Sequence, residues 1–191
     1  GWATLGVDGP MARNVADTAL LLSAIAGPGG ETATELADPG ARFAQPLERD
    51  FRGTRIAMSR GLPGVPVDPE IARAVDAQAR VFAALGCEVE FDDPDLSDAE
   101  DVFRIERAWM IGTLVDGFDD AQRAALKPEI HDEYRLHRSL TAADLGRMFV
   151  RKTRLFERMR TFMQRYAFYV LPTTQVMPFD VGLRSPAHVQ G

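Results

Sequence analysis

One strand–helix–strand pattern constrains the fold of this chain more than any other feature. The segment Thr54-Arg55-Ile56-Ala57-Met58 predicts a short strand, and Asp68-Pro69-Glu70 has the features of a helix start, with Asp68 as the N-cap. Apolar residues then recur at helical spacing up to Gly86, which ends the helix, and residues 88–91 alternate as in a half-buried strand. Two strands joined by one helix pair in parallel with a right-handed crossover, so we predict an α/β fold.

Most of the remaining sequence is typical of helices. Residues 97–165 predict a helical insert, in which successive helices cover about 98–114, 119–126, 128–138 and 141–165. Phe168-Tyr169-Val170-Leu171 then predicts a buried strand that ends at Pro172. We therefore expect a few strands of mixed sheet flanked by helices, in a single domain over residues 1–191 that is part of a larger domain.

Composition excludes several classes of partner. The chain has 191 residues, of which 46% are hydrophobic, and a formal net charge of -6. An acidic chain lacks the basic surface that nucleic-acid binding needs, and it gives no attraction to anionic membranes. No apolar run approaches the roughly 18 residues that cross a bilayer, and the sequence does not open like a signal peptide. We expect a cytoplasmic protein that binds neither nucleic acid nor membrane.

The most distinctive motif lies near the N-terminus, where Gly-Pro-Met-Ala-Arg-Asn-Val-Ala-Asp runs from Gly9 to Asp17. Pro10 suits the first turn of a helix, and the following apolar residues cover most of the helix circumference. We therefore expect a helix over about residues 11–26 that is buried on several sides. Arg13 and Asp17 stand at i and i+4, and we expect an ion pair between them, with substrate contact as the alternative.

Three segments in the same order resemble the amidase signature family. The first is the Gly9–Asp17 motif with its apolar continuation. The second is Gly53-Thr54-Arg55-Ile56-Ala57 with the later Leu85-Gly86-Cys87-Glu88-Val89, and the third is Tyr169-Val170-Leu171-Pro172-Thr173-Thr174. The resemblance spans nearly the whole chain and implies a partial amidase-signature fold that hydrolyses the C–N bonds of amides.

The same resemblance implies that the catalytic residues lie elsewhere. Family members use a Ser–cis-Ser–Lys triad, whose Gly/Ser-rich stretch precedes the Gly-Pro-Met-Ala-Arg segment. This sequence has no such stretch, and neither Lys127 nor Lys152 has a neighbourhood like the family's catalytic lysine. We expect the C-terminal portion of an amidase, truncated, without catalytic residues or cofactor, and inactive alone. Its expected partners are the missing N-terminal half of the enzyme and a small-molecule amide substrate.

A second hypothesis is a non-catalytic binding or assembly module derived from the amidase fold. Without an upstream half, the apolar helix at residues 11–26 leaves apolar surface uncovered. Such a surface requires either a partner chain or self-association.

Candidate substrate-binding residues follow the last strand. Thr173, Thr174 and Gln175 come directly after it, and ligands of α/β sheets bind at the carboxyl ends of strands. A plain exit from strand to loop is the structural alternative. Trp109, in the helical insert, is a further candidate for the pocket wall, with core packing as its alternative.

No metal site is predicted. His131 and His137 are six residues apart, which does not place both on one face of a helix. The single cysteine, Cys87, favours a small buried residue beside a strand over a nucleophile.

Overall fold

The computed structural model describes residues 4–30, 34–35, 37–186 and 188–189, and its Cα positions form two compact units. The first unit takes Gly1–Arg49 and Phe103–Thr141, and the second takes Asp50–Val102 and Ala142–Gly191. We expected a single domain over residues 1–191. Whether the two units together form one domain depends on how they join, so this expectation stays a prediction.

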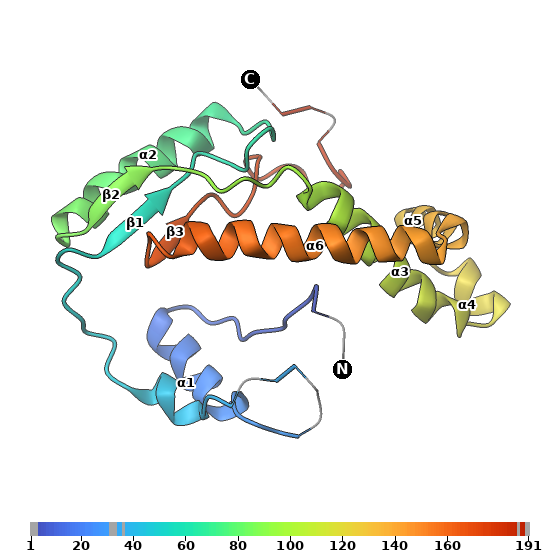
Figure 1. Ribbon diagram of the computed structural model, residues 1–191, viewed down its shortest axis with the longest axis horizontal. Helices are drawn as coiled ribbons and strands as arrows, with labels where there is room; N and C mark the ends of the chain where they lie inside the picture. Colours follow the sequence, from blue (N-terminus) through green and yellow to red (C-terminus); the bar gives the residue numbers. More distant parts are fainter. Residues whose placement is uncertain (1–3, 31–33, 36, 187, 190–191) are drawn as a thin grey trace. The chain divides into compact units, whose positions relative to one another are not determined.

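The helices and strands follow the order that the sequence predicts, with one additional short helix at Gly40–Ala44 (Figure 1). In chain order the elements are α1 (Val15–Ile25), the 3-10 helix η1 (Gly40–Ala44), β1 (Arg55–Met58), α2 (Pro69–Ala84), β2 (Glu88–Phe91), α3 (Ala99–Asp116), α4 (Asp120–Ala124), α5 (Pro128–Ser139), α6 (Ala142–Met163) and β3 (Phe168–Val170). The helical insert expected at about 97–165 is therefore helices α3 to α6. Among the described residues, no helix is both long enough and apolar enough to span a lipid bilayer.

The strands of the second unit form one sheet in the order β2-β1-β3. Ile56 of β1 lies opposite Val89 of β2 on one side and Phe168 of β3 on the other, and both pairings are parallel. The predicted strand–helix–strand unit and the α/β class are confirmed. We expected a mixed sheet, whereas all three strands within the described residues run in the same direction.

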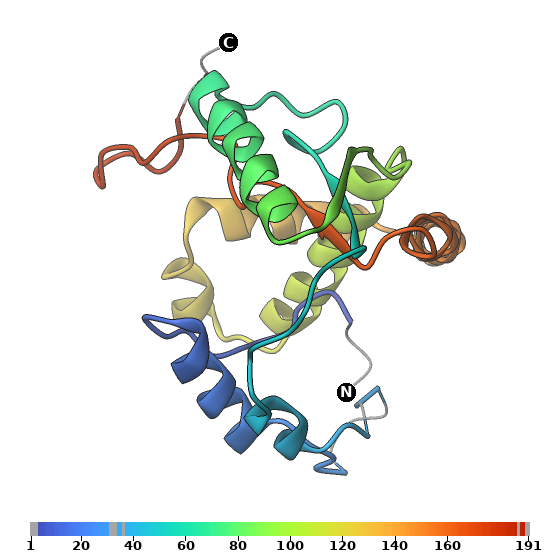
Figure 2. The ribbon, with the colours of Figure 1, turned by 90° about the vertical axis from the view of Figure 1, so that its left-hand side faces the viewer.

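Alternate residues of β1 pack against two different helices. Ile56 and Met58 form a buried cluster with Cys87, and apolar side chains of α2 cover it. Ala57 points to the opposite face, where it packs with Phe162 at the end of α6 and with Tyr166. In Figure 2, α6 is seen end-on and the strands lie between it and α2. The second unit is therefore a helix–sheet–helix sandwich, and Cys87 is a buried core residue as expected.

Helix α2 begins and ends where its sequence predicts. The Asp68 carboxylate accepts a hydrogen bond from the backbone N–H of Glu70 at 2.8 Å, which satisfies a donor of the first turn. Beyond the helix, Gly86 has φ +85°, and an added Cβ would lie 2.5 Å from the Arg52 side chain. The turn into β2 therefore needs glycine at this position.

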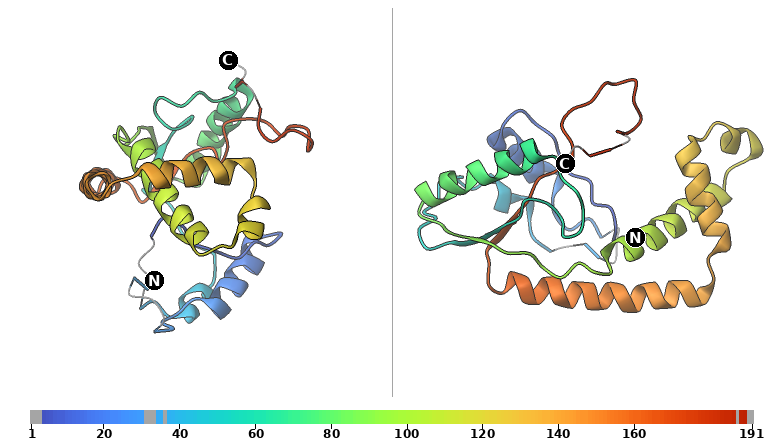
Figure 3. Two further views of the ribbon diagram at one scale, coloured as in Figure 1. Left: turned by 90° about the vertical axis from the view of Figure 1, so that its right-hand side faces the viewer. Right: turned by 90° about the horizontal axis from the view of Figure 1, so that it is seen from above.

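Helix α6 is one continuous helix, and only its C-terminal end lies beside the strands (Figure 3). Met148 and Phe162 are its buried residues, at opposite ends of the helix. Phe149 and Phe156 are apolar residues of α6, yet they are 47% and 62% exposed. Part of the apolar face of α6 is therefore open in this structure.

Helix α1 differs from the sequence prediction in its start and its burial. It begins at Val15, and Asn14 caps it by accepting a hydrogen bond from the Asp17 N–H at 2.8 Å. Pro10 was expected in the first turn, but Gly9, Pro10 and Arg13 all precede the helix, because the Asn14 side chain caps a later start at Val15.

The expected Arg13–Asp17 ion pair does not form within the described residues; the Asp17 carboxylate instead accepts from the Asn14 amide at 2.9 Å. The expectation of a helix buried on several sides was also wrong. None of the residues of α1, all of which the structure describes, is buried. Within the first unit α1 packs on η1, where an added Cβ on Gly40 would lie 2.2 Å from the Ser23 carbonyl oxygen.

Candidate functional site

The carboxyl edge of the sheet gathers polar residues from three distant parts of the chain. Because the three strands are parallel, Ser59, Asp92 and the segment 171–175 all leave the sheet at this same edge (Figure 1). Ligands of open α/β sheets bind outside the carboxyl ends of the strands. A ligand site in the second unit is therefore expected at this edge.

The three predicted site residues of the loop, Thr173, Thr174 and Gln175, are all exposed at this edge. Thr173 and Thr174 are exposed, and neither side chain makes a hydrogen bond to any residue in the described part of the chain. Gln175 is different, since its side-chain amide donates to the Pro66 carbonyl oxygen at 3.0 Å. The structure thus places all three residues in the predicted loop. Their direct contact with substrate stays a prediction.

Trp109 lies on α3 in the first unit and is half-buried there. Its carbonyl oxygen accepts a hydrogen bond from the Thr113 hydroxyl at 2.8 Å. The loop at residues 173–175 belongs to the second unit, so a pocket wall shared with Trp109 also stays a prediction.

A buried tyrosine network, which the sequence analysis missed, stands at the same edge. The Tyr166 hydroxyl lies 2.8 Å from Glu90 Oε2 and 2.8 Å from Asp92 Oδ2. It has one proton and can donate to only one carboxylate at a time. Arg55 pairs with Glu90 at 2.7 Å and Arg165 with Asp92 at 2.8 Å, so each carboxylate also has a cationic partner.

The network alters the pKa values of its members. Burial of the ring, followed by the hydrogen bonds to Asp92 and Glu90, raises the pKa of Tyr166 to about 12. Hydrogen bonding from Arg55, and then from Tyr166, holds the pKa of Glu90 below its ordinary value. The Tyr166 hydrogen bond lowers the pKa of Asp92 in the same way. These carboxylates are stabilised as anions, so they are poor candidates for a general acid or base at neutral pH.

Tyr169 ties β3 to the loop that follows β2. Its hydroxyl donates to Asp93 Oδ1 at 2.7 Å, and its ring packs edge-on against Phe162 with ring centres 5.3 Å apart. Burial first, and the hydrogen bond to Asp93 second, raise the pKa of Tyr169 to about 12. In the sequence, Asp92, Asp93 and Asp95 form a small acidic cluster in a turn, with no local sign of a partner. The tyrosines that bind this turn lie 74 to 76 residues further along the chain, so no local spacing reveals them.

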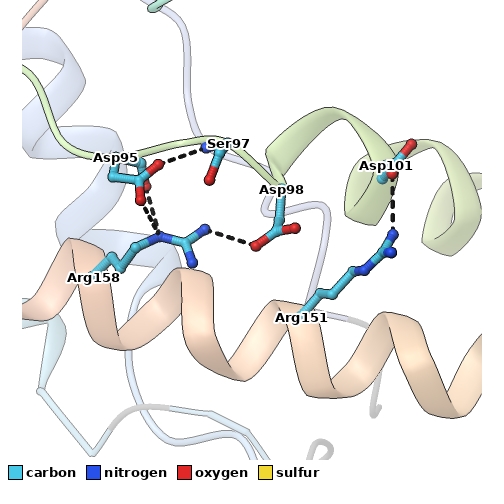
Figure 4. Close-up of polar contacts among 6 residues, drawn as sticks. All are labelled: Asp95, Ser97, Asp98, Asp101, Arg151 and Arg158. Atoms are coloured by element: carbon cyan, nitrogen blue, oxygen red, sulfur yellow. Dashed lines mark hydrogen bonds and ion pairs between the residues drawn. The ribbon is translucent and has the colours of Figure 1, made fainter.

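Arginines of α6 hold the segment that leads into α3 (Figure 4). Arg158 donates to the Asp95 carbonyl oxygen at 2.9 Å and pairs with the Asp98 carboxylate at 3.1 Å. Nearer the start of α6, Arg151 pairs with Asp101 in the first turn of α3 at 3.0 Å. These contacts fix the entry to α3, and they use groups that would otherwise be free to bind a ligand.

An open depression of about 600 Å³ lies between this segment and the end of α6. It is lined by Asp93, Pro94, Asp95, Glu157, Arg158, Thr161, Phe162, Gln164 and Arg165. Asp93, Arg158 and Arg165 are already held by Tyr169, the 95–98 segment and Asp92 respectively. A ligand pocket needs convergent polar groups that are free to orient the ligand, and the main charges here are already paired.

No catalytic or metal centre emerges from the remaining candidates in the described part of the chain. Lys127 is exposed ahead of α5, and Lys152 is half-buried on α6. His137 Nε2 lies 3.0 Å from Asp116 Oδ2 in the first unit, where the same carboxylate also accepts from Tyr134. Across the residues that the structure describes, no group of three or more His, Cys, Asp or Glu side chains could hold a metal ion.

Sequence comparison places this α/β chain in a family of hydrolases. The sequence profile described as "Amidase" matches residues 2–190. An acylamidase of Rhodococcus erythropolis is 28% identical over 96% of this chain, which covers 39% of that relative. A glutamyl-tRNA(Gln) amidotransferase chain of Thermosynechococcus vestitus is 40% identical over 41% of this chain and 16% of its own length.

Solved structures show the same fold. A bacterial aryl acylamidase of the amidase signature family superposes with a TM-score of 0.80 at 23% identity, covering 90% of this chain and 37% of that one. The 6-aminohexanoate cyclic dimer hydrolase gives a TM-score of 0.69 at 19% identity, over 90% and 38% of the two chains. The fold is therefore that of the amide hydrolases. This chain belongs to the Amidase family. It matches the acylamidase over 96% of its own length but spans only about two fifths of that relative.

Proposed function

We propose that this chain is the C-terminal portion of an amidase that hydrolyses the C–N bond of amides. The observation that carries the proposal is the unequal coverage of the two aligned proteins. The acylamidase alignment uses 96% of this chain but only 39% of the relative. Because the alignment covers only 39% of the acylamidase, a large part of that relative has no counterpart in this chain. The family hydrolyses amide C–N bonds.

The chemistry supports the proposal that the catalytic triad lies on another segment. Amide hydrolysis through a serine needs an activated hydroxyl, a base with a lowered pKa and backbone donors for the oxyanion. A lysine base has to be desolvated or placed near another cation. Lys127 and Lys152 are both partly open to solvent, and the sequence holds no Gly/Ser-rich stretch beside either. We infer that this chain is inactive alone.

The exposed apolar residues of α1 support a role in assembly with the rest of the enzyme. Val15, Leu20 and Ile25 are 70%, 68% and 66% exposed, on a helix with no buried residue in the described structure. An apolar helix surface of this kind is stabilised by covering it. We propose the N-terminal half of the same amidase as the cover, with this chain completing the central sheet and one wall of the substrate pocket.

Among amides, we propose small acyl amides as the substrates. The acylamidase resembles this chain along nearly its whole length, insert included. The glutamyl-tRNA(Gln) amidotransferase chain resembles only 41% of it. The net charge of -6 also opposes binding of a polyanion such as tRNA.

Two experiments test this proposal: sequencing the DNA upstream of the Gly1 codon, and assaying the resulting full-length product for amidase activity. We expect an in-frame Gly/Ser-rich segment, and a full-length product that releases aniline from aryl acyl amides. A start codon and ribosome site directly ahead of Gly1, with no hydrolysis by the product, would support the assembly module instead.

A further inference from the structure

The loop after β3 is tethered at both of its ends. At its start, the backbone N–H of Ser59 donates to the Val170 carbonyl oxygen at 2.8 Å, and Ser59 is itself buried. At its end, the Gln175 carbonyl oxygen accepts from the Asp68 N–H at 2.8 Å. The loop is therefore positioned by the end of β1 and by the turn ahead of α2.

Gln175 forms the second tether through both its backbone and its side chain. Besides its backbone contact, its side-chain amide donates to the Pro66 carbonyl oxygen at 3.0 Å, across 109 residues of sequence. The Pro66–Asp68 turn is itself fixed, because the Asp68 carboxylate caps the first turn of α2. Gln175 thus binds the loop to the start of a packed helix, and one of its two amide N–H donors is occupied in doing so.

Between the tethers lie Thr173 and Thr174. Both are exposed, and in the described part of the chain neither hydroxyl has a hydrogen-bond partner. A hydroxyl offers one donor and two acceptor positions, which suits the carbonyl and the N–H of an amide. A loop that is held at both ends keeps such hydroxyls in place at little further cost in entropy when substrate binds.

We propose that Gln175 is a positioning residue, which holds Thr173 and Thr174 at the carboxyl edge so that their hydroxyls bind the amide substrate. The inference rests on the proposed function, since it assumes that the intact protein hydrolyses amides. It replaces direct substrate contact by Gln175 with an action through the loop.

A double-mutant cycle in the full-length gene product separates these two roles. We expect Gln175→Ala and the isosteric Gln175→Glu to lower kcat/KM for an aryl acyl amide about tenfold, mainly through KM. In a Thr173→Val/Thr174→Val background, Gln175→Ala should cause little further loss, because the groups that it positions are gone. Gln78→Ala is the matched control: its amide donates to Ala74 within α2 at 3.3 Å, and kcat/KM should not change.

Hydrogen exchange of the Asp68 amide in the same variants provides a readout that does not need activity. Loss of the tether should speed exchange in Gln175→Ala and leave it unchanged in Gln78→Ala. Unchanged exchange, or losses in kcat/KM that multiply across the cycle, would overturn the positioning role. If the wild-type product hydrolyses no amide, the proposed function fails and the substrate role of the loop fails with it. The exchange result still decides whether Gln175 is the tether.

Discussion

The Tyr166 hydroxyl lies 2.8 Å from Asp92 Oδ2, although 74 residues separate the two in the chain. The contact joins the end of α6 to the residue that follows β2, and a second contact at 2.8 Å reaches Glu90 within β2. One buried phenol thereby fixes a long helix to the carboxyl edge of the sheet. Since the Thr173–Gln175 loop leaves the same edge, the geometry of the candidate site depends on this network.

Replacing Tyr166 by phenylalanine should therefore lower stability. The variant keeps the ring packing against Phe162 but leaves Asp92 and Glu90 without the hydroxyl donor. We expect a lower urea midpoint. Tyr134→Phe is the control, because its hydroxyl donates to Asp116, which is 44% exposed and can bind water instead. Equal midpoints for the two variants would show that the Tyr166 hydroxyl does not stabilise the fold.

Stability should also fall at alkaline pH. The pKa of Tyr166 is about 12 in the folded chain against an ordinary value of 10, and the pKa of Tyr169 is likewise raised to about 12. The folded state thus favours the protonated phenols, so their contribution is fully present below pH 10 and is lost as the pH rises towards 12. Urea unfolding over this range should show a downward slope that is shallower in Tyr166→Phe. An unchanged slope in that variant would assign the effect to other groups.

Gly112 should tolerate no side chain. A Cβ at this position of α3 would lie 2.0 Å from His137 Cγ, so Gly112→Ala forces the helix or the ring to move. We expect a loss of about 1–3 kcal/mol in the free energy of unfolding. Gly146→Ala on α6 is the matched control. Nothing lies within 4 Å of its added Cβ, and the better helix propensity should give a gain of about 0.5–1 kcal/mol. A neutral Gly112→Ala would contradict the close approach of the ring.

Two arginines of α6 should differ sharply in importance. Arg158 holds the Asp95 carbonyl oxygen and the Asp98 carboxylate, both distant in sequence, and its side chain is 26% exposed. Arg160 pairs only locally with Glu157, and both side chains are about half exposed. We expect Arg158→Ala to cost about 1 kcal/mol in chemical unfolding, and Arg160→Ala less than about 0.5 kcal/mol. Equal costs would mean that the Arg158 contacts in Figure 4 add no more stability than a local ion pair on the helix surface.

Local signals in the sequence predicted most elements of the second unit. The Asp68 cap, the glycine at position 86 and the alternation at residues 88–91 each act within a few residues, and the structure has α2 and β2 where they place them. Helix α1 was placed less well. Pro10 suits a first turn, but the Asn14 side chain caps a later start, and capping decides the boundary.

Burial and long-range pairing could not be predicted from the same signals. An apolar helix predicts that a covering surface exists, but it does not say which part of the protein supplies it. Helix α1 packs on η1, yet none of its residues is buried. Likewise the Tyr166 and Tyr169 contacts depend on where α6 ends relative to β2, which no local pattern encodes. The loop at residues 173–175 was predicted because parallel strands place their following loops at one edge. The tether from Gln175 to Pro66 needed the structure.

Complementation between the two halves of the enzyme tests the central claim most directly. Release of aniline from an aryl acyl amide would be measured for this chain alone, for the upstream half alone, and for the two produced together. We predict turnover only when both halves are present, because in the proposed function the upstream half carries the catalytic residues and this chain completes the fold and pocket. Turnover by this chain alone that persists after substitution of Lys127 and Lys152 would contradict the claim.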